Sequence, residues 1–419
     1  VAIGNAALSG NTTAANNTAV GSAALLANTT GADNVAVGKG ALTTNTTGAD
    51  NVAMGSNAMF SNTTGTPNVA IGTSSMYQNT TGANNVAVGP SALNANTTAA
   101  NNTAVGSSAL RANTTAANNA AVGYQALTTN TTGTRNVAVG SLALWVNTTA
   151  SYNTAFGYSA LGANTTGAFN SAFGDAALAA NTTGTQNIAI GHSTLDANTI
   201  GGYNVGVGVG ALGANTTASN NTAVGYNSLL ANTTGAQNTA VGKDAMLDHT
   251  TGSYNTALGY ASLYESTTGS SNVALGVSAL QNNTTASNNT AVGTNALLAN
   301  TTGASNTAVG TSALDANTTA ANNTAVGVSA LTAVTTGAGN IAVGQEAGKA
   351  LTTGVDNILI GRDPATSAVD SSHQIVMGDH VTGNADNSFC FGVDSTDSAI
   401  AFGATSITAP SDVRLKEDI

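Results

Sequence analysis

The sequence repeats itself every 17 residues over most of its length. The glycine that ends each Asn-x-Ala-x-Gly segment recurs from Gly4 to Gly361 in 21 steps of 17 residues, with no insertion or deletion. One slipped residue would shift every later glycine, so each unit must follow the same path. A strict repeat of this kind is typical of solenoids, in which each unit forms one coil that packs on its neighbours.

The positions of the repeat differ in the residues that they accept. The residue four before the glycine is Asn in all 21 complete copies, and the residue two before it is Ala in 20 of 22. An apolar residue directly precedes the glycine, Leu or Met follows it by four in 20 of 21 copies, and Thr follows it by eight without exception. The unit therefore reads N-(V/T)-A-(V/I)-G-x-x-A-L-x-x-N-T-T-(G/A)-x-x.

This pattern predicts an all-β protein, a parallel β-roll or β-helix solenoid of 17-residue coils. The N-V-A-V-G segment is a short strand with apolar residues on both faces, which is typical of parallel strands. The A-L pair predicts a second short strand or a bend. Glycine and the N-T-T-G stretch predict corners, because Gly permits positive φ angles and Asn and Thr form turns with their own side chains.

The two invariant polar positions predict ladders along the stack. An Asn side chain carries both a donor and an acceptor, so stacked copies can satisfy one another and hold the register. The threonines lie at corners, where a hydroxyl can bond to the backbone. We expect structural ladders at Asn17, Asn34, Asn51, Asn68 and Asn85, and at Thr12, Thr29 and Thr46. The alternative reading of N-T-T as a glycosylation acceptor is less favoured, because the motif is the repeated corner itself.

A single coil is too thin to bury its apolar residues. One face of every N-V-A-V-G strand would remain in water along the whole stack, a stripe larger than monomers usually expose. Packing against identical chains around an axis removes this stripe, so we expect a homotrimeric fibre.

The composition excludes several classes of protein. Only 6% of the residues are charged, and eight Lys and Arg in a chain with a net charge of −11 cannot form a nucleic-acid-binding patch. No apolar run reaches the length of a membrane span, and no cofactor or metal motif stands out. The single cysteine, Cys390, cannot form a disulfide within the chain and is expected to be a buried small apolar residue. His373 and His380 allow a metal site, but solvated loop histidines are the favoured reading.

Three segments are expected. Residues 1–361 form the repeat shaft, residues 362–410 an irregular β transition region with Phe389 and Phe391 in a more aromatic core, and residues 411–419 a separate C-terminal segment.

Two resemblances follow from these motifs. The N-x-A-(V/I)-G-x-x-A-L unit is similar to the head repeat of trimeric autotransporter adhesins of the YadA type, which implies a trimeric parallel β-roll. That family has a 14-residue repeat, so this chain has three extra residues, placed by the sequence in the N-T-T corner.

The segment S-D-V-R-L-K-E-D-I at residues 411–419 resembles the start of the intramolecular chaperone domain of phage tail fibres and tailspikes (peptidase family S74). That resemblance implies chaperone-assisted trimer assembly and self-cleavage before Ser411, with Ser411 as the nucleophile and Lys416 as the base. The alternative is that Ser411 caps the following segment.

These observations favour a structural role. We expect the shaft of an extracellular or virion-associated trimeric fibre, resembling a tail fibre, that displays a tip or adhesin. An alternative is a surface adhesin or binding module, which binds glycan or a host receptor through exposed aromatics such as Trp145, Tyr152 and Tyr158, or ice through the Thr row. Beyond self-cleavage, no enzymatic activity is expected, because the acidic residues are isolated.

Overall fold

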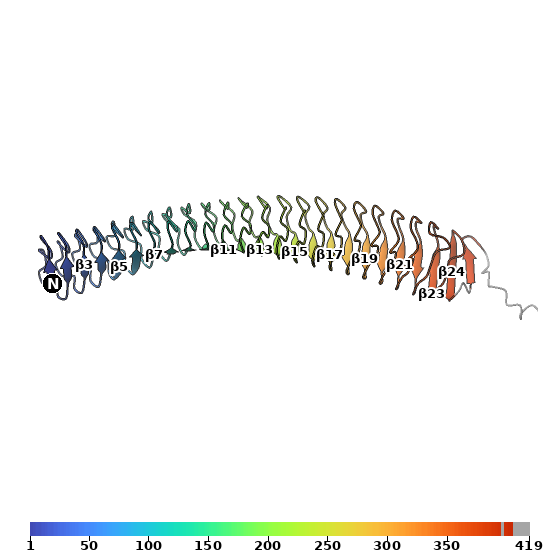
Figure 1. The fold of residues 1–419 in the computed structure, drawn as a ribbon, viewed down its shortest axis with the longest axis horizontal. Coiled ribbons are helices and arrows are strands. Elements are labelled where there is room, and N and C mark those ends of the chain that lie inside the picture. Colours follow the sequence, from blue (N-terminus) through green and yellow to red (C-terminus); the bar gives the residue numbers. More distant parts are fainter. Residues whose placement is uncertain (395–397, 405–419) are drawn as a thin grey trace, which may run out of the picture. The chain divides into compact units, whose positions relative to one another are not determined.

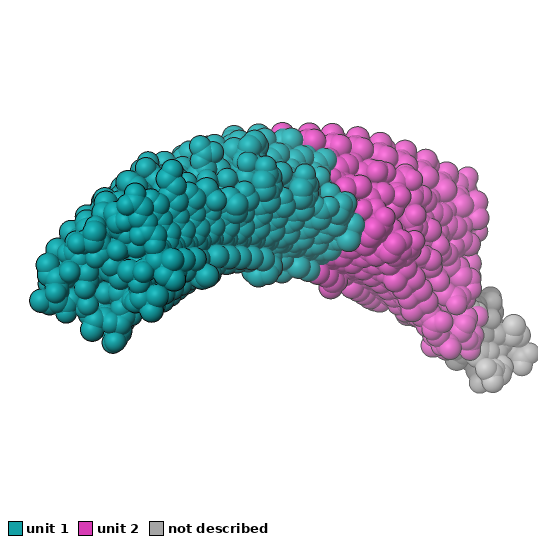
Figure 2. All heavy atoms as spheres, turned by 60° about the vertical axis from the view of Figure 1, so that its left-hand side comes forward, with its two compact units in different colours: residues 1–217 teal, residues 218–419 magenta. Residues whose placement is uncertain are grey.

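The computed structural model describes residues 1–394 and 398–404. It divides into two compact units, residues 1–217 and 218–419, which Figure 2 colours separately. Each unit is a stack of short strands joined by turns, with one strand in each repeat, as the ribbon in Figure 1 shows. Among the described residues no helix is long and apolar enough to cross a membrane.

The strands of the first unit are β1 (Ala2–Ile3), β2 (Thr18–Val20), β3 (Val35–Val37), β4 (Val52–Met54), β5 (Asn68–Ile71), β6 (Asn85–Val88), β7 (Thr103–Val105), β8 (Ala120–Val122), β9 (Val137–Val139), β10 (Thr154–Phe156), β11 (Ser171–Phe173), β12 (Ile188–Ile190) and β13 (Val205–Val207). Those of the second unit are β14 (Thr222–Val224), β15 (Thr239–Val241), β16 (Thr256–Leu258), β17 (Val273–Leu275), β18 (Thr290–Val292), β19 (Thr307–Val309), β20 (Thr324–Val326), β21 (Ile341–Val343), β22 (Ile358–Ile360), β23 (Ile375–Asp379), β24 (Ser388–Val393) and β25 (Ser398–Ala401).

Within each unit, repeated strands pair in parallel with an offset of one repeat. In β3 and β4, for example, Ala36 lies opposite Ala53, and Val37 lies opposite Met54. Equivalent residues therefore stack directly, at the spacing of about 4.8 Å that separates neighbouring strands. The predicted all-β parallel solenoid with 17-residue coils is confirmed. Of the two alternatives expected at the A-L pair, a second short strand or a bend, the described repeats show a turn and no strand.

The core of each coil is built from small residues and one large one. The alanines two before and three after the repeat glycine are buried, and so is the leucine four after it; Ala36, Ala41 and Leu42 are all 0% exposed. The leucine lies in the turn with a left-handed backbone, as at Leu42 with φ of 51°. That conformation costs an L-residue roughly 1–2 kcal/mol, which is offset by about 2 kcal/mol from burying the side chain.

The repeat glycine has a steric cause. At Gly89 the backbone adopts φ of +130°, and a Cβ there would lie 2.6 Å from the carbonyl oxygen of Gly106 in the next coil. Any side chain would separate the stacked coils, so the glycine is required once per repeat.

The stack continues past Gly361 into the second unit's last strands. Ile375 of β23 pairs with Ile358 of β22, again one 17-residue step away, and β24 follows after a shorter coil of 14 residues, with Phe389 opposite Ile375. Strand β25 then pairs with β24 in the antiparallel direction. Cys390 on β24 is a free thiol and fully buried.

Deleting a whole coil should be far less damaging than adding one residue. Removal of residues 103–119 leaves Asn102 followed by Ala120, so every stacked row is preserved. A single alanine inserted after Ala104 reverses inward and outward positions at that strand and shifts the rows that follow. We expect the deletion variant to keep the far-ultraviolet circular dichroism spectrum and cooperative thermal unfolding, and the insertion variant to lose stability. Equal loss in both variants would contradict the register interpretation.

Candidate functional site

The invariant asparagine before each strand joins one coil to the next through the backbone. Oδ1 of Asn17 accepts a hydrogen bond from the backbone N–H of Asn34 at 2.9 Å, and Nδ2 of Asn17 donates to the carbonyl oxygen of Gly31 at 2.9 Å. The side chain thus supplies an acceptor to an N–H at the start of a strand and a donor to a carbonyl at the corner. Each bond of this kind contributes about 1 kcal/mol.

Asn34, Asn68 and Asn85 follow the same pattern, whereas Oδ1 of Asn51 accepts from the side-chain amide of Asn68. The backbone N–H of Asn51 donates to Oδ1 of Asn34, and that of Asn85 donates to Oδ1 of Asn68, each at 3.0 Å. Bonds between the side-chain amides are longer, 3.2 Å from Asn68 to Asn51. The sequence predicted a ladder of amides here, whereas the side chains bond mainly to the backbone, because the N–H at the strand start needs an acceptor.

A second asparagine row, seven residues after the glycine, forms the ladder of amides. Nδ2 of Asn45 donates to Oδ1 of Asn28 at 2.9 Å, and Nδ2 of Asn62 donates to Oδ1 of Asn45 at 2.8 Å. The bonds continue at every step to Asn215 in the first unit. Sequence reasoning treated this residue as part of the corner; its presence in 13 successive repeats of that unit was the available signal.

The threonine row bonds to the backbone of the next coil. Oγ1 of Thr12 donates to the carbonyl oxygen of Thr29, and Oγ1 of Thr29 donates to that of Thr46, both at 2.9 Å; Oγ1 of Thr46 donates to the carbonyl oxygen of Thr63 at 3.0 Å. These hydrogen bonds run along the stack and connect each corner to the corner of the next coil.

In the second unit the amide row is interrupted by residues that do not match. Buried His249 and Ser266 occupy two successive places, and Val334 follows Asn317. Within the described part of the chain, Oδ1 of Asn317 and Oγ of Ser266 are buried without a hydrogen-bond partner. An unsatisfied buried polar atom costs about 1–3 kcal/mol, so these coils are weaker than their neighbours.

Replacing His249 with Asn should stabilise the second unit, most strongly at low pH. Burial lowers the pKa of the His249 imidazole below its ordinary value of 6.5, although its hydrogen bond to the Gly252 carbonyl opposes this. The unfolded chain therefore takes up a proton at a pH where the folded chain does not, and stability is lost as the pH falls below about 6.5. An amide extends the row by one coil and removes this loss.

Denaturant unfolding at pH 7.5 and at pH 5.5 measures the effect. We expect His249→Asn to raise the free energy of unfolding by about 1–2 kcal/mol at the higher pH and by more at the lower pH. The control is His192→Asn, since the His192 side chain is 60% exposed. A gain that is equal at both pH values would contradict the role of His249 protonation.

Each unit carries an apolar face, formed by the residue one before each repeat glycine and, in the coils where it is Val, Ile or Ala and not Thr or Ser, by the residue three before it. These side chains alternate with the buried alanine of the strand and point outward; Phe156 and Phe173 are 45% and 40% exposed. Their rings stack on each other with centroids 5.9 Å apart. Half-exposed or exposed Val, Ile, Leu, Met or Phe occupies the position before the glycine in every described repeat strand.

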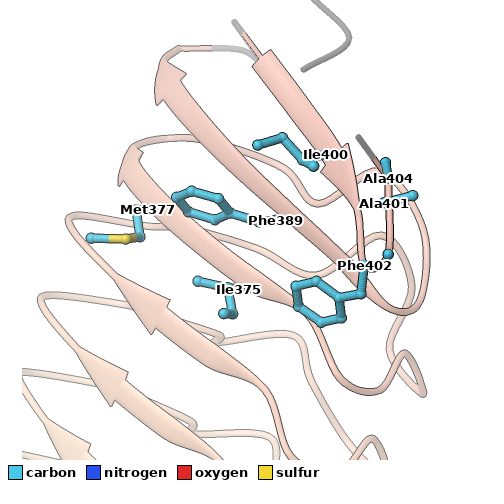
Figure 3. Close-up of a pocket in the computed structure, with 8 residues that line it drawn as sticks. Ile375, Met377, Phe389, Ile400, Ala401, Phe402 and Ala404 are labelled. Atoms are coloured by element: carbon cyan, nitrogen blue, oxygen red, sulfur yellow. The ribbon is translucent and has the colours of Figure 1, made fainter. Parts of the chain in front are cut away.

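At the end of the second unit the apolar face widens into a pocket of about 390 Å³ (Figure 3). Ile375 and Met377 of β23 and Phe389 of β24 lie on one side of it, with Ile400 of β25 and Phe402 beside them (Figure 3). The pairing places Ile375, Phe389 and Ile400 side by side on three neighbouring strands. Three neighbouring strands thus contribute apolar side chains to this pocket.

The exposed aromatics singled out in the sequence lie in three different rows. Trp145, Tyr152 and Tyr158 stand five, twelve and one residues after their glycines. The Tyr152 ring stacks on that of Phe169 with centroids 4.9 Å apart, and the Arg135 guanidinium lies over its other side at 5.2 Å. The faces of the Tyr152 ring are therefore occupied by the chain's own side chains.

The two tail histidines lie beside different carboxylates. His373 is 3.6 Å from Asp356, whereas His380 is 3.0 Å from Asp379 and 3.6 Å from Asp394. Asp379, His380 and Asp394 are close enough to share an ion. However, Arg362 donates two hydrogen bonds to Asp379, at 2.8 and 2.7 Å, and holds the pKa of that carboxyl below its ordinary value. A guanidinium at this distance opposes a cation, so the cluster is an exposed ion-pair network.

Ser411 and Lys416, the predicted self-cleavage pair, lie outside the described residues. No protein-family model matches the chain, and no curated protein matches it.

Proposed function

We propose that the chain is the structural shaft of a fibre, in which three copies pack through the apolar face and carry a tip or adhesin away from a base. The observation that supports this most directly is the apolar face itself. In each unit it places an exposed or half-exposed apolar side chain in every coil. Monomers rarely expose contiguous apolar patches larger than a few hundred Å². Association with copies of the same chain buries the apolar face without requiring a second kind of protein.

The stacking supports a rotation axis parallel to the fibre. With such an axis every coil meets its own equivalents at the same level, so Phe156 and Phe173 of one chain pack near the same residues of the others. A closed rotational assembly also prevents indefinite lateral growth. The number three rests on the resemblances of the repeat and of residues 411–419 to trimeric fibre proteins. Those resemblances also support a location outside the cell or on a virion.

The rows of hydrogen bonds suit a load-bearing rod. Each coil is tied to the next by strand pairing, by Asn side chains and by Thr hydroxyls, all of which run along the stack. Ice binding through the Thr row has less support, because the Thr12, Thr29 and Thr46 hydroxyls already donate to backbone carbonyls.

Introducing charged residues into the apolar face should dissociate the assembly into monomers without unfolding the chain. We expect the chain to sediment at three times its mass of 40.5 kDa, and the double variant Phe156→Asp/Phe173→Asp to shift toward the monomer. Two carboxylates per chain cannot be buried at the contact unless their pKa values rise. Sedimentation equilibrium together with circular dichroism checks both mass and fold.

Thr149→Asp/Thr166→Asp is the matched control, since it adds the same charges at exposed corners of the adjoining coils. It should remain assembled. A wild-type chain that sediments as a monomer at micromolar concentration would refute the proposal, and so would equal dissociation of both variants.

A further inference from the structure

Side chains five residues after the repeat glycine form a row of their own, here called the fifth-residue row. Where two successive coils of the first unit carry aromatics in this row, the rings stack. Phe60 and Tyr77 have centroids 5.3 Å apart and planes inclined by only 8°. An aromatic ring in this row therefore offers its face to whatever stands one coil further along.

Trp145 occupies the same row, but nothing large follows it. The next two coils carry Gly162 and Ala179 in this row. A notch of about 260 Å³ results, lined by Trp145, Val146, Ser159, Gly162, Ala163 and Ala179. The Trp145 side chain is 43% exposed. Tyr77 stacks on Phe60 from the next coil. In the coil after Trp145, no side chain fills the corresponding space.

We propose that this notch binds one pyranose ring of a glycan, stacked on Trp145. A pyranose presents a flat patch of C–H groups to an aromatic face and hydroxyls around its rim. The notch matches both properties: an indole and small apolar residues line it, and so does the polar residue Ser159. Pockets for drug-sized ligands hold about 300–1,000 Å³, so this notch admits a single ring.

A polar residue in the lining favours a sugar over an aromatic ligand. Ser159 is that residue, and its hydroxyl can both donate to and accept from a sugar hydroxyl.

The site lies in the turn segment of the coil and not on the strand that carries the apolar face. It therefore does not depend on the proposed assembly. Two other exposed rings of this region, Tyr152 and Phe169, differ from Trp145 because they occupy each other's faces. Only Trp145, among the aromatics of the described fifth-residue row, is followed by two small residues.

The chain has a single tryptophan, so its fluorescence reports on this notch alone. Titration of the full chain with the methyl glycosides of glucose, galactose and N-acetylglucosamine should give a saturable change for at least one of them. Ligand efficiency for a ring of this size predicts a Kd on the order of 1 mM. Free indole serves as the aromatic competitor.

The decisive variant is Gly162→Tyr, which fills the notch with a ring and leaves Trp145 in place. We expect it to abolish the fluorescence response to the glycosides, whereas Tyr77→Gly, which alters the same row elsewhere, should leave the response unchanged. Saturation-transfer NMR on Trp145→Ala should show loss of the glycoside signal while circular dichroism is retained.

Three results would overturn the proposal. One is the absence of a response to all three glycosides at about ten times the expected Kd. Another is a response that survives in Gly162→Tyr. The third is saturable binding of indole without binding of any glycoside, which would make the notch a site for an aromatic side chain.

Discussion

The register of the stack is the constraint on which the rest of this structure depends. Because each coil contains 17 residues and pairs in parallel with the next, every side chain meets its own counterpart about 4.8 Å away. Only groups that bond well to copies of themselves, or that need no partner, can occupy such a row. Asn, Thr, Ala, Leu and Gly meet this condition in different ways, and they account for most of each coil.

The rows also show how such a structure accommodates exceptions. His249, Ser266 and Val334 interrupt the amide row in the second unit, and the buried atoms beside them lose partners. Neighbouring coils still pair through the strands and the threonine corners. Because each coil contacts only its neighbours, a local defect weakens a few coils without abolishing the fold. A substitution at the repeat glycine is different in kind, since it would force two coils apart.

The core explains why an isolated chain leaves an apolar face uncovered. Two alanines and one leucine fill the inside of a coil, and this narrow core cannot also enclose the outward residues of the strand. The apolar face and the pocket at Phe389 and Phe402 are thus consequences of a thin cross-section. Variation is concentrated where neither the core nor the ladders impose a residue type, and the Trp145 notch arises there from one large residue followed by two small ones.

The sequence by itself determined the coil length, the parallel strand direction, the turn positions and the presence of an outward apolar stripe. All of these follow from the periodicity of the residues, which can be read directly from the linear sequence. Only the tertiary structure decided which asparagine row forms the amide ladder, since that depends on whether Asn17 or Asn28 faces its own copy or a backbone N–H.

The same holds for the left-handed backbone of Leu42, which sequence propensity disfavours and core burial imposes. The antiparallel direction of β25 and the open face of Trp145 were likewise invisible in the sequence. They depend on contacts between residues that the repeat does not specify, and such contacts exist only once the coils are stacked.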